Sequence, residues 1–302
     1  MQRIQWIRCI FFYTKRRYFV NLSTQDQELL KLHYAWPAPY PKLARLLENN
    51  YRNEYLLHSS HPQRTNLNTK LALLSPLPLL ELLLEKGIIP IPFTHPDYPD
   101  ELKQLIDPPA VLYTKGDTSL LKKSNKVAII GSRKAGNYSM CAMDMIVPPL
   151  VQHDCAIVSG LAKGADTMAH QAALKYGGQT IAVLGHGFFH VYPKENAELA
   201  TVIAKEHLLI TEYPPYHPPA KWTFPMRNRI ISGLSSTIVI TESAVKSGTM
   251  STIEHALDHG KEVFAVPGPI DSLLSIGPNK LLDEGARPIW DGFQIVESLV
   301  ES

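Results

Sequence analysis

The sequence is poor in cysteine, its charge is almost balanced, and it has no long uninterrupted apolar run. The three cysteines among 302 residues, Cys9, Cys141 and Cys155, form no Cys-x-x-Cys pair. This spacing excludes a disulfide framework and is typical of a protein from a reducing cytoplasm, so we expect a cytoplasmic protein. No segment approaches the roughly 18 apolar residues of a membrane-spanning helix, so no membrane partner is expected. The net charge of +2 is too small to indicate a polyanion partner, and only the local distribution of basic residues can do so.

Two common nucleotide-binding signatures are also absent. The glycine-containing segment 131–136, Gly-Ser-Arg-Lys-Ala-Gly, lacks the Gly-Lys-Ser/Thr ending of a P-loop and does not match Gly-x-Gly-x-x-Gly. Neither ATP hydrolysis nor dinucleotide binding is therefore predicted. His186 and His190 are close in sequence, but no third metal ligand is spaced near them, so we expect no metal site and no cofactor.

The composition predicts one sizeable α/β domain with a smaller domain before it. Hydrophobic residues make up 45% of the chain and charged residues 19%. Residues 1–22 are expected to be a basic and apolar tail rather than a signal peptide, because Arg8 interrupts the apolar stretch and no small-residue cleavage site follows. Leucines at helical spacing, punctuated by prolines, predict a small all-helical domain over residues 23–87.

Residues 88–302 are expected to form the main domain. Residues 88–125 are rich in proline and predict an extended connection that adds edge structure. Strand and helix patterns then alternate, which predicts a mostly parallel sheet with helices on both faces. The expected strands lie near 126–130, 155–158, 180–184, 207–211, 237–241 and 262–266.

Two strand ends carry glycine-containing polar loops that are suited to an anion. Gly131, Ser132 and Arg133 follow the first strand, and glycine lets the backbone expose its N–H groups close to a ligand. An ordinary tight turn would explain the glycine but not the arginine. Ser159, Gly160 and Lys163 follow the next strand, with Lys163 as the candidate phosphate contact. The acid at 166 is better explained as a helix cap than as a catalytic group.

Three later segments add further basic or polar side chains that are candidates for contact with an anion. Lys194 follows the third strand, near aromatic residues that could stack on bases or pack under the loop. Arg227, Asn228 and Arg229 follow a proline at an expected helix start, where cations oppose the helix dipole; either a buried acid such as Glu242 or a nucleic-acid phosphate would balance them. Ser247, Gly248 and Thr249 precede another helix and form either a phosphate cradle, to which Lys246 would add charge, or a plain helix cap.

These segments together resemble the DNA-processing protein A family (DprA, also called Smf). The resemblance covers about residues 97–290 and rests on consecutive motifs in the right order: VAIIGSRKAGNYS, IVSGLAKGADTMAHQAAL, VLGHGFFHVYPKEN, FPMRNRIISGLSSTIVITES, SGTMST and FAVPGPIDSLLSIGPNKLLDEGA. It implies an extended Rossmann-like domain preceded by a helical SAM-like domain. Lys163 stands where arginine is frequent in the family. The sequence ends soon after Val296, so the winged-helix domain of some members is not expected.

The resemblance implies a non-enzymatic protein that binds single-stranded DNA during natural transformation, protects it and loads the recombinase RecA, usually as a homodimer. Arg133, Lys163 and the turn Arg227–Arg229 would then line a basic DNA pocket. Two alternatives use a related fold. A nucleotide N-glycosidase of the LOG type needs a glutamate three residues after the threonine of its Gly-Thr turn, but that position here is Thr252, and Glu254 is turned about 200° from it around a helix. A nucleotide-binding sensor would use the same loops without DNA.

Overall fold

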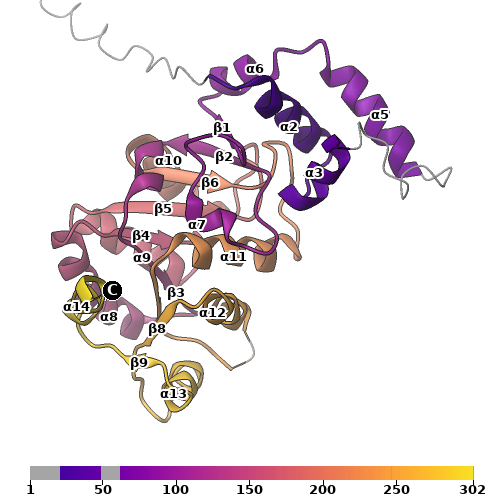
Figure 1. The fold of residues 1–302 in the computed structure, drawn as a ribbon. Coiled ribbons are helices and arrows are strands. Elements are labelled where there is room, and N and C mark those ends of the chain that lie inside the picture. Colours follow the sequence, from indigo (N-terminus) through magenta and orange to yellow (C-terminus); the bar gives the residue numbers. More distant parts are fainter. Residues whose placement is uncertain (1–20, 49–61, 246, 302) are drawn as a thin grey trace, which may run out of the picture.

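The computed structural model describes residues 21–48, 62–245 and 247–301 (Figure 1). Almost all of the predicted tail, and Lys246, lie outside the described residues. Within these ranges no single helix has the length and apolar character to cross a membrane, although the bent pair Leu67–Leu74 and Leu79–Glu85 meets those criteria jointly.

The described part of the chain contains one nine-stranded sheet in the order β1-β2-β6-β5-β4-β3-β7-β8-β9. Strand β2 is antiparallel to β1 and β6, and every other pairing is parallel. The strands are β1 (Ile89–Pro92), β2 (Val111–Gly116), β3 (Lys126–Ile130), β4 (Ala156–Ser159), β5 (Gln179–Leu184), β6 (Leu208–Thr211), β7 (Thr237–Ile240), β8 (Glu262–Ala265) and β9 (Arg287–Pro288).

The strand order creates a switch point between β3 and β7. From β3 the chain adds β4, β5 and β6 to one side, and it then returns to place β7, β8 and β9 on the other. The register pairs Ile130 at the end of β3 with Ile240 at the end of β7. Loops that leave neighbouring parallel strands at such a point diverge and open a crevice, which is where ligands bind in doubly wound folds.

The two faces of the sheet bury different sets of side chains, as the alternation of apolar residues along the strands requires. In β3, Ala128 and Ile130 join one core cluster, whereas Val127 and Ile129 join the other. The first face packs against α7 (Asp100–Lys103), α11 (Thr223–Leu234), α12 (Gly248–Asp258) and α13 (Ile276–Asp283). The second face packs against α8 (Asn137–Gln152), α9 (Ala165–Lys175), α10 (Ala197–Glu206) and α14 (Phe293–Glu301).

A helical segment precedes the sheet and lies at its β1–β2 end (Figure 1). It contains α2 (Thr24–Ala35), α3 (Tyr40–Glu48), α5 (Pro62–Leu74) and α6 (Leu79–Glu85). Helix α2 starts with a capping box, in which the Ser23 hydroxyl and the Asp26 carboxylate satisfy each other's backbone N–H groups. Leucines of these helices share one core with Val111 and Tyr113 of β2. The division of the chain at residues 87 and 88 remains our proposal.

The predicted fold class is confirmed, because the chain forms a mostly parallel sheet with helices on both faces. The expected edge structure before Lys126 is the antiparallel pair β1 and β2. The expected helix start at Pro225 was wrong, since α11 begins at Thr223, whose hydroxyl donates to the Ala220 carbonyl at 2.8 Å.

Candidate nucleic-acid interface

The loop after β3 is drawn tightly against its neighbours. A Cβ atom on Gly131 would lie 2.6 Å from the Ala165 Cβ and 2.7 Å from the Thr241 hydroxyl, so only glycine fits there. The backbone N–H of Ser132 donates to the Glu242 carbonyl at 2.5 Å. Arg133 follows with an exposed side chain. The loop therefore fixes the backbone on both sides of the crevice and presents Arg133 outward.

The N-terminus of α8, which follows this loop, already holds an anion from the protein itself. The Glu242 carboxylate accepts hydrogen bonds from the Gly136 N–H at 2.9 Å and from the Ser139 hydroxyl at 2.8 Å. A carboxylate at a helix N-terminus is stabilised by the unpaired N–H groups and the helix dipole. Glu242 therefore occupies this helix end in place of a bound anion, and it is not the partner of Arg227 or Arg229.

The loop after β4 is built around two buried side chains. Ser159 is fully buried, and its hydroxyl donates to the Ile129 carbonyl at 2.7 Å, so Ser159 links two strands and does not face a ligand. The Asp166 carboxylate accepts from the backbone N–H of Gly160 at 3.2 Å and of Ala162 at 3.4 Å. The predicted helix cap was wrong, because Gly164 is the N-cap of α9 and Asp166 lies in its first turn, from where its carboxylate shapes the preceding loop.

Arg227 of α11 reaches under the same loop. Its guanidinium donates to the Gly160 carbonyl at 2.6 Å and also to the Val183 carbonyl, and the residue is only 4% exposed. Burial lowers its pKa, Asp166 opposes that shift, and the positive charge of Arg133 adds to it. Arg227 therefore holds the ends of β4 and β5 together and contributes positive potential from below the crevice.

The predicted phosphate contact by Arg229 is not supported by its surroundings. Arg229 is 3% exposed, and its guanidinium lies 2.7 Å from the Glu212 carboxylate and 2.9 Å from the Asp107 carboxylate. Burial raises the pKa of Glu212, and the facing guanidinium opposes that shift. Because two carboxylates neutralise it, Arg229 is a structural arginine. Asn228 lies between the two arginines in sequence, and its side-chain amide donates to the Gly248 carbonyl at 3.1 Å.

The polar side chains of the loop before α12 also form most of their hydrogen bonds within the protein. The Thr249 hydroxyl donates to the Gly131 carbonyl at 2.9 Å, and the Ser247 and Ser243 hydroxyls are 2.7 Å apart. Gly248 is exposed, with open space where a Cβ atom would be. These contacts fasten the loop after β7 to the loop after β3, which agrees better with a structural role than with a phosphate cradle.

A cavity of about 200 Å³ opens among the loops that follow β3, β4 and β5, and we call it the first cavity. The Arg133 guanidinium carbon lies 5.7 Å from the centre of the Phe224 ring, which in turn lies 5.3 Å from the ring of Tyr192. The lining residues are Arg133, Gly160, Leu161, Ala162, Lys163, Leu184, Gly185, His186, Tyr192, Pro193 and Phe224. The cavity thus combines two cationic side chains with two aromatic rings.

Two lysines lie at this end of the molecule. Lys163 lines the cavity, and its ammonium lies 2.5 Å from the Glu195 carboxylate, with both side chains more than half exposed. Lys194 begins the short 3-10 helix η2 (Lys194–Asn196) directly after Pro193, and its side chain is exposed. Neither Arg133 nor Lys194 has an acidic partner among the described residues, and Arg133 is the one that lines the cavity.

Sequence reasoning missed Phe224 as a site residue. The ring projects into the crevice from the first turn of α11, three residues before Arg227, and it is partly exposed. The available signal was an aromatic residue three positions before the first of two arginines, since single-strand binding sites combine aromatic rings with cations.

His186 lines the same cavity with both ring nitrogens already engaged. They lie 3.0 Å from the Gly187 carbonyl oxygen and 3.2 Å from the Tyr192 carbonyl oxygen. Burial lowers the pKa of His186, although the two carbonyls oppose that shift. In the part of the chain that the structure describes, no group of three or more His, Cys, Asp or Glu side chains is placed to hold a metal ion.

The fold and the site together define a doubly wound α/β protein with a basic, aromatic cavity at the carboxyl ends of its strands. A family model described as DNA recombination-mediator protein A matches residues 90–300. The chain belongs to this family.

Curated relatives and solved structures agree with this assignment. The chain is 46% identical over 217 residues to the DNA processing protein DprA of Bacillus subtilis, covering 72% of this chain and 73% of that one. It is 42% identical over 199 residues to DprA of Streptococcus pneumoniae, covering 66% and 70%. The structure of the Streptococcus pneumoniae protein superposes with a TM-score of 0.76 at 32% identity, covering 92% of this chain and 98% of that one.

A second solved structure concerns nucleic acid directly. It is DNA processing protein A from Helicobacter pylori, described for its single-stranded DNA binding mode. It superposes with a TM-score of 0.64 at 32% identity, covering 71% of this chain and 96% of that one.

Proposed function

We propose that this protein binds single-stranded DNA in the crevice at the carboxyl ends of β3, β4 and β5, as a DNA-processing protein of natural transformation. The observation that carries the proposal is the exposed, unpaired Arg133 beside Phe224 and Tyr192 in the first cavity. A guanidinium recognises a backbone phosphate, and an aromatic ring stacks on any base. The single-stranded DNA binding mode described for the Helicobacter pylori relative supports this assignment.

The shape of the cavity favours a single strand over a duplex. Its volume of about 200 Å³ admits about one base, and bases reach Phe224 and Tyr192 only when they are unpaired. Contacts to phosphates carry no sequence information, so little sequence preference is expected. The contacts that we propose are made by Arg133, Lys163, Lys194, Tyr192 and Phe224, with Arg227 adding charge from below.

Family membership also supports proposals about the partners and the compartment. We propose that the protein loads RecA onto the bound strand, that it acts in the cytoplasm, and that it is a homodimer. Exposed aliphatic side chains that are close in sequence support self-association, because Ile270 is 98% exposed, Leu273 76% and Ile276 45%.

A LOG-type N-glycosidase is the second candidate, and the α12 geometry disfavours it. Thr252, which occupies the position of the required glutamate, is buried, whereas Glu254 is exposed on the other side of the helix. Neither residue lines the first cavity. We therefore propose a binding protein without enzymatic activity.

Mobility shifts test the proposed function. Long oligothymidylate is expected to bind stoichiometrically, whereas duplex DNA of the same length and mononucleotides bind much more weakly, and adding RecA is expected to give a slower ternary complex. Preferential binding of duplex DNA would contradict the proposal, and release of free base from a nucleoside monophosphate would favour the glycosidase.

Removing the acidic partner of Lys163 is expected to strengthen DNA binding. In a Glu195→Gln variant, Lys163 no longer pairs with a carboxylate and a negative charge leaves the rim of the cavity. Exposed ion pairs are weak, so an affinity gain of no more than about fivefold is expected. Fluorescence anisotropy with labelled oligothymidylate measures it. Glu198→Gln, an exposed acid in the first turn of α10, is the matched control. A loss of affinity in Glu195→Gln would remove Lys163 from the proposed contacts.

A further inference from the structure

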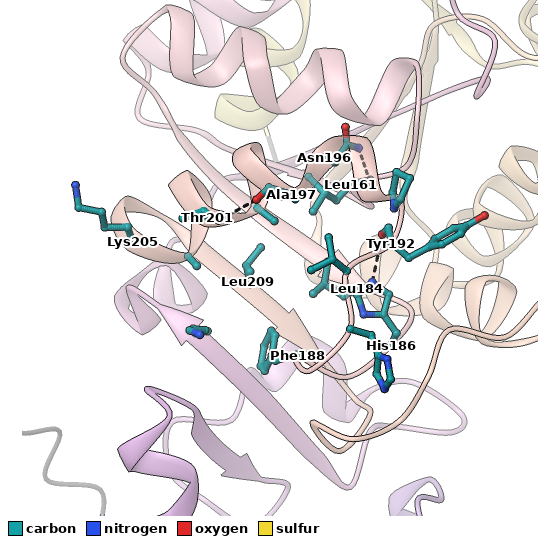
Figure 2. A pocket seen from close by; sticks show the side chains of 16 residues that line it. Leu161, Leu184, His186, Phe188, Tyr192, Asn196, Ala197, Thr201, Lys205 and Leu209 are labelled. Atoms are coloured by element: carbon teal, nitrogen blue, oxygen red, sulfur yellow. Dashed lines mark hydrogen bonds between the residues drawn. The ribbon is translucent and has the colours of Figure 1, made fainter.

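A second, larger cavity adjoins the first on the face of the sheet that α10 covers (Figure 2). Its volume is about 470 Å³, which lies in the range of about 300–1,000 Å³ typical of small-molecule sites. Five residues line both cavities: Leu161, Leu184, His186, Tyr192 and Pro193. The two cavities therefore share a wall that these side chains form.

The floor and one wall of the second cavity are apolar. Leu184 of β5 and Leu209 of β6 form the floor with Leu161, and the ring of Phe188 lies beside them. Helix α10 contributes Ala197, Ala200 and Ala204, which recur at helical spacing on one side of the helix. Small residues there leave room for a flat ring between the helix and the loop that carries Phe188.

The far end of the second cavity is basic. Lys205 and Tyr192 lie at opposite ends of the pocket (Figure 2), and Lys115 of β2 also lines it. The Lys205 ammonium lies 3.2 Å from the carboxylate of its neighbour Glu206, whereas Lys115 has no carboxylate partner among the described residues. An apolar cavity with ammonium groups at one end complements a ligand that has an apolar ring and a negative charge.

We propose that the second cavity is an additional nucleotide subsite, which takes a base against α10 and its phosphate at Lys115. This inference rests on the proposed function and extends it, because the base belongs to the strand held in the first cavity. Tyr192 stands between the two cavities and is 45% exposed, so a strand that leaves Phe224 passes this ring to reach α10. The chain thus binds consecutive nucleotides on both sides of the loop 186–193.

Filling the second cavity tests the proposal. Ala200→Phe occupies the space with a ring, and Val202→Phe, on the same helix but outside both cavities, is the matched control. We expect the dissociation constant for dT12 to rise about 5–100-fold in Ala200→Phe, as for the loss of one stacked base, and to stay unchanged in Val202→Phe. Lys115→Ala is expected to reduce the salt slope by about 0.7, and Lys122→Ala, whose lysine pairs with Asp97, is not.

Photocrosslinking locates the base independently of affinity. A dT12 strand with 4-thiothymidine at a central position is expected to crosslink to the α10 peptide 197–205 in the wild-type chain, and this crosslink is lost in Ala200→Phe. Residues 197–205 line the second cavity and not the first, so this crosslink reports on the second cavity alone. Circular dichroism and thermal unfolding confirm that the variants are folded.

The outcomes separate this proposal from the proposed function. Unchanged dT12 affinity in Ala200→Phe and Lys115→Ala, with no crosslink to 197–205, overturns the second subsite while leaving the first intact. Binding of free dTMP identifies the source of the ligand. If Ala200→Phe abolishes binding of dTMP but leaves the affinity for dT12 unchanged, the strand assignment is overturned in favour of a free nucleotide. If wild-type protein does not bind dT12 at all, the proposed function itself has failed.

Discussion

Replacing Arg133 with alanine is expected to weaken binding of single-stranded DNA about 10–100-fold and to leave the fold intact. A hydrogen bond to a charged group contributes about 1.5–3 kcal/mol, and Arg133 is the cation of the first cavity without an acidic partner among the described residues. Its side chain is exposed, so its removal leaves no buried group unsatisfied. Anisotropy titrations at several salt concentrations measure both the affinity and the salt slope, which should fall by about 0.7.

Two further variants show which property of Arg133 matters. Arg133→Lys keeps the charge but loses the planar group that lies over the Phe224 ring, so an intermediate affinity is expected. Arg287→Ala removes the same charge from β9, where Arg287 pairs with Glu262 at 2.6 Å. Equal losses in Arg133→Ala and Arg287→Ala would show that only the overall charge matters and would contradict a specific contact.

Replacing Arg229 with alanine is expected to destabilise the protein by about 3–5 kcal/mol. The change leaves the buried Glu212 carboxylate without its partner, and Asp107 loses one as well. Urea denaturation measures the loss, and Arg287→Ala, which breaks an exposed pair, should cost no more than about 1 kcal/mol. A loss of stability below about 1 kcal/mol in Arg229→Ala would contradict the structural role that we assign to this arginine.

The loss in Arg229→Ala should also depend on pH. Burial raises the pKa of Glu212 in the folded chain above its value in the unfolded chain, and removing Arg229 takes away the opposing influence. A carboxyl group with a raised folded pKa favours the folded state at low pH, and this contribution disappears as pH rises through the folded pKa. The stability deficit of the variant is therefore expected to be smaller near pH 5 than near pH 7.5. The double variant Arg229→Met with Glu212→Leu, which removes both buried charges, should recover part of the loss.

The sequence predicted the sheet well because its strands are buried on both faces and read as short β-branched runs. The expected strand at 126–130 agrees with β3 residue for residue, and the others differ by one residue at their ends. The loops that meet at the crevice were also predicted, since parallel strands place their carboxyl ends on one edge. Which side chains face the ligand could not be predicted, because that depends on contacts between distant segments.

The two arginines of α11 show why. They are two residues apart and therefore point about 200° apart around the helix. Arg227 meets the Gly160 carbonyl from a segment 67 positions away, whereas Arg229 meets Glu212 and Asp107. Nothing in the local sequence distinguishes their partners. Ser159 is a similar case, since its polar hydroxyl suggested a ligand contact but satisfies the carbonyl of Ile129 in the neighbouring strand.

The switch point between β3 and β7 also determines when the crevice can exist during folding. Its walls are joined by the hydrogen bond from Thr249 to Gly131, across 118 positions, and by the bond from the Ser132 N–H to Glu242. Contacts this distant in sequence close large loops and form slowly. The strands β3 to β6 are made on the ribosome before β7, so a nascent chain lacks one wall of the crevice until the segment after Ser236 has emerged. The residues that line the first cavity all precede Ser236, but the loop that carries Arg133 is fastened to Glu242 and Thr249 only after β7 has been made, so the proposed DNA site is completed late in folding.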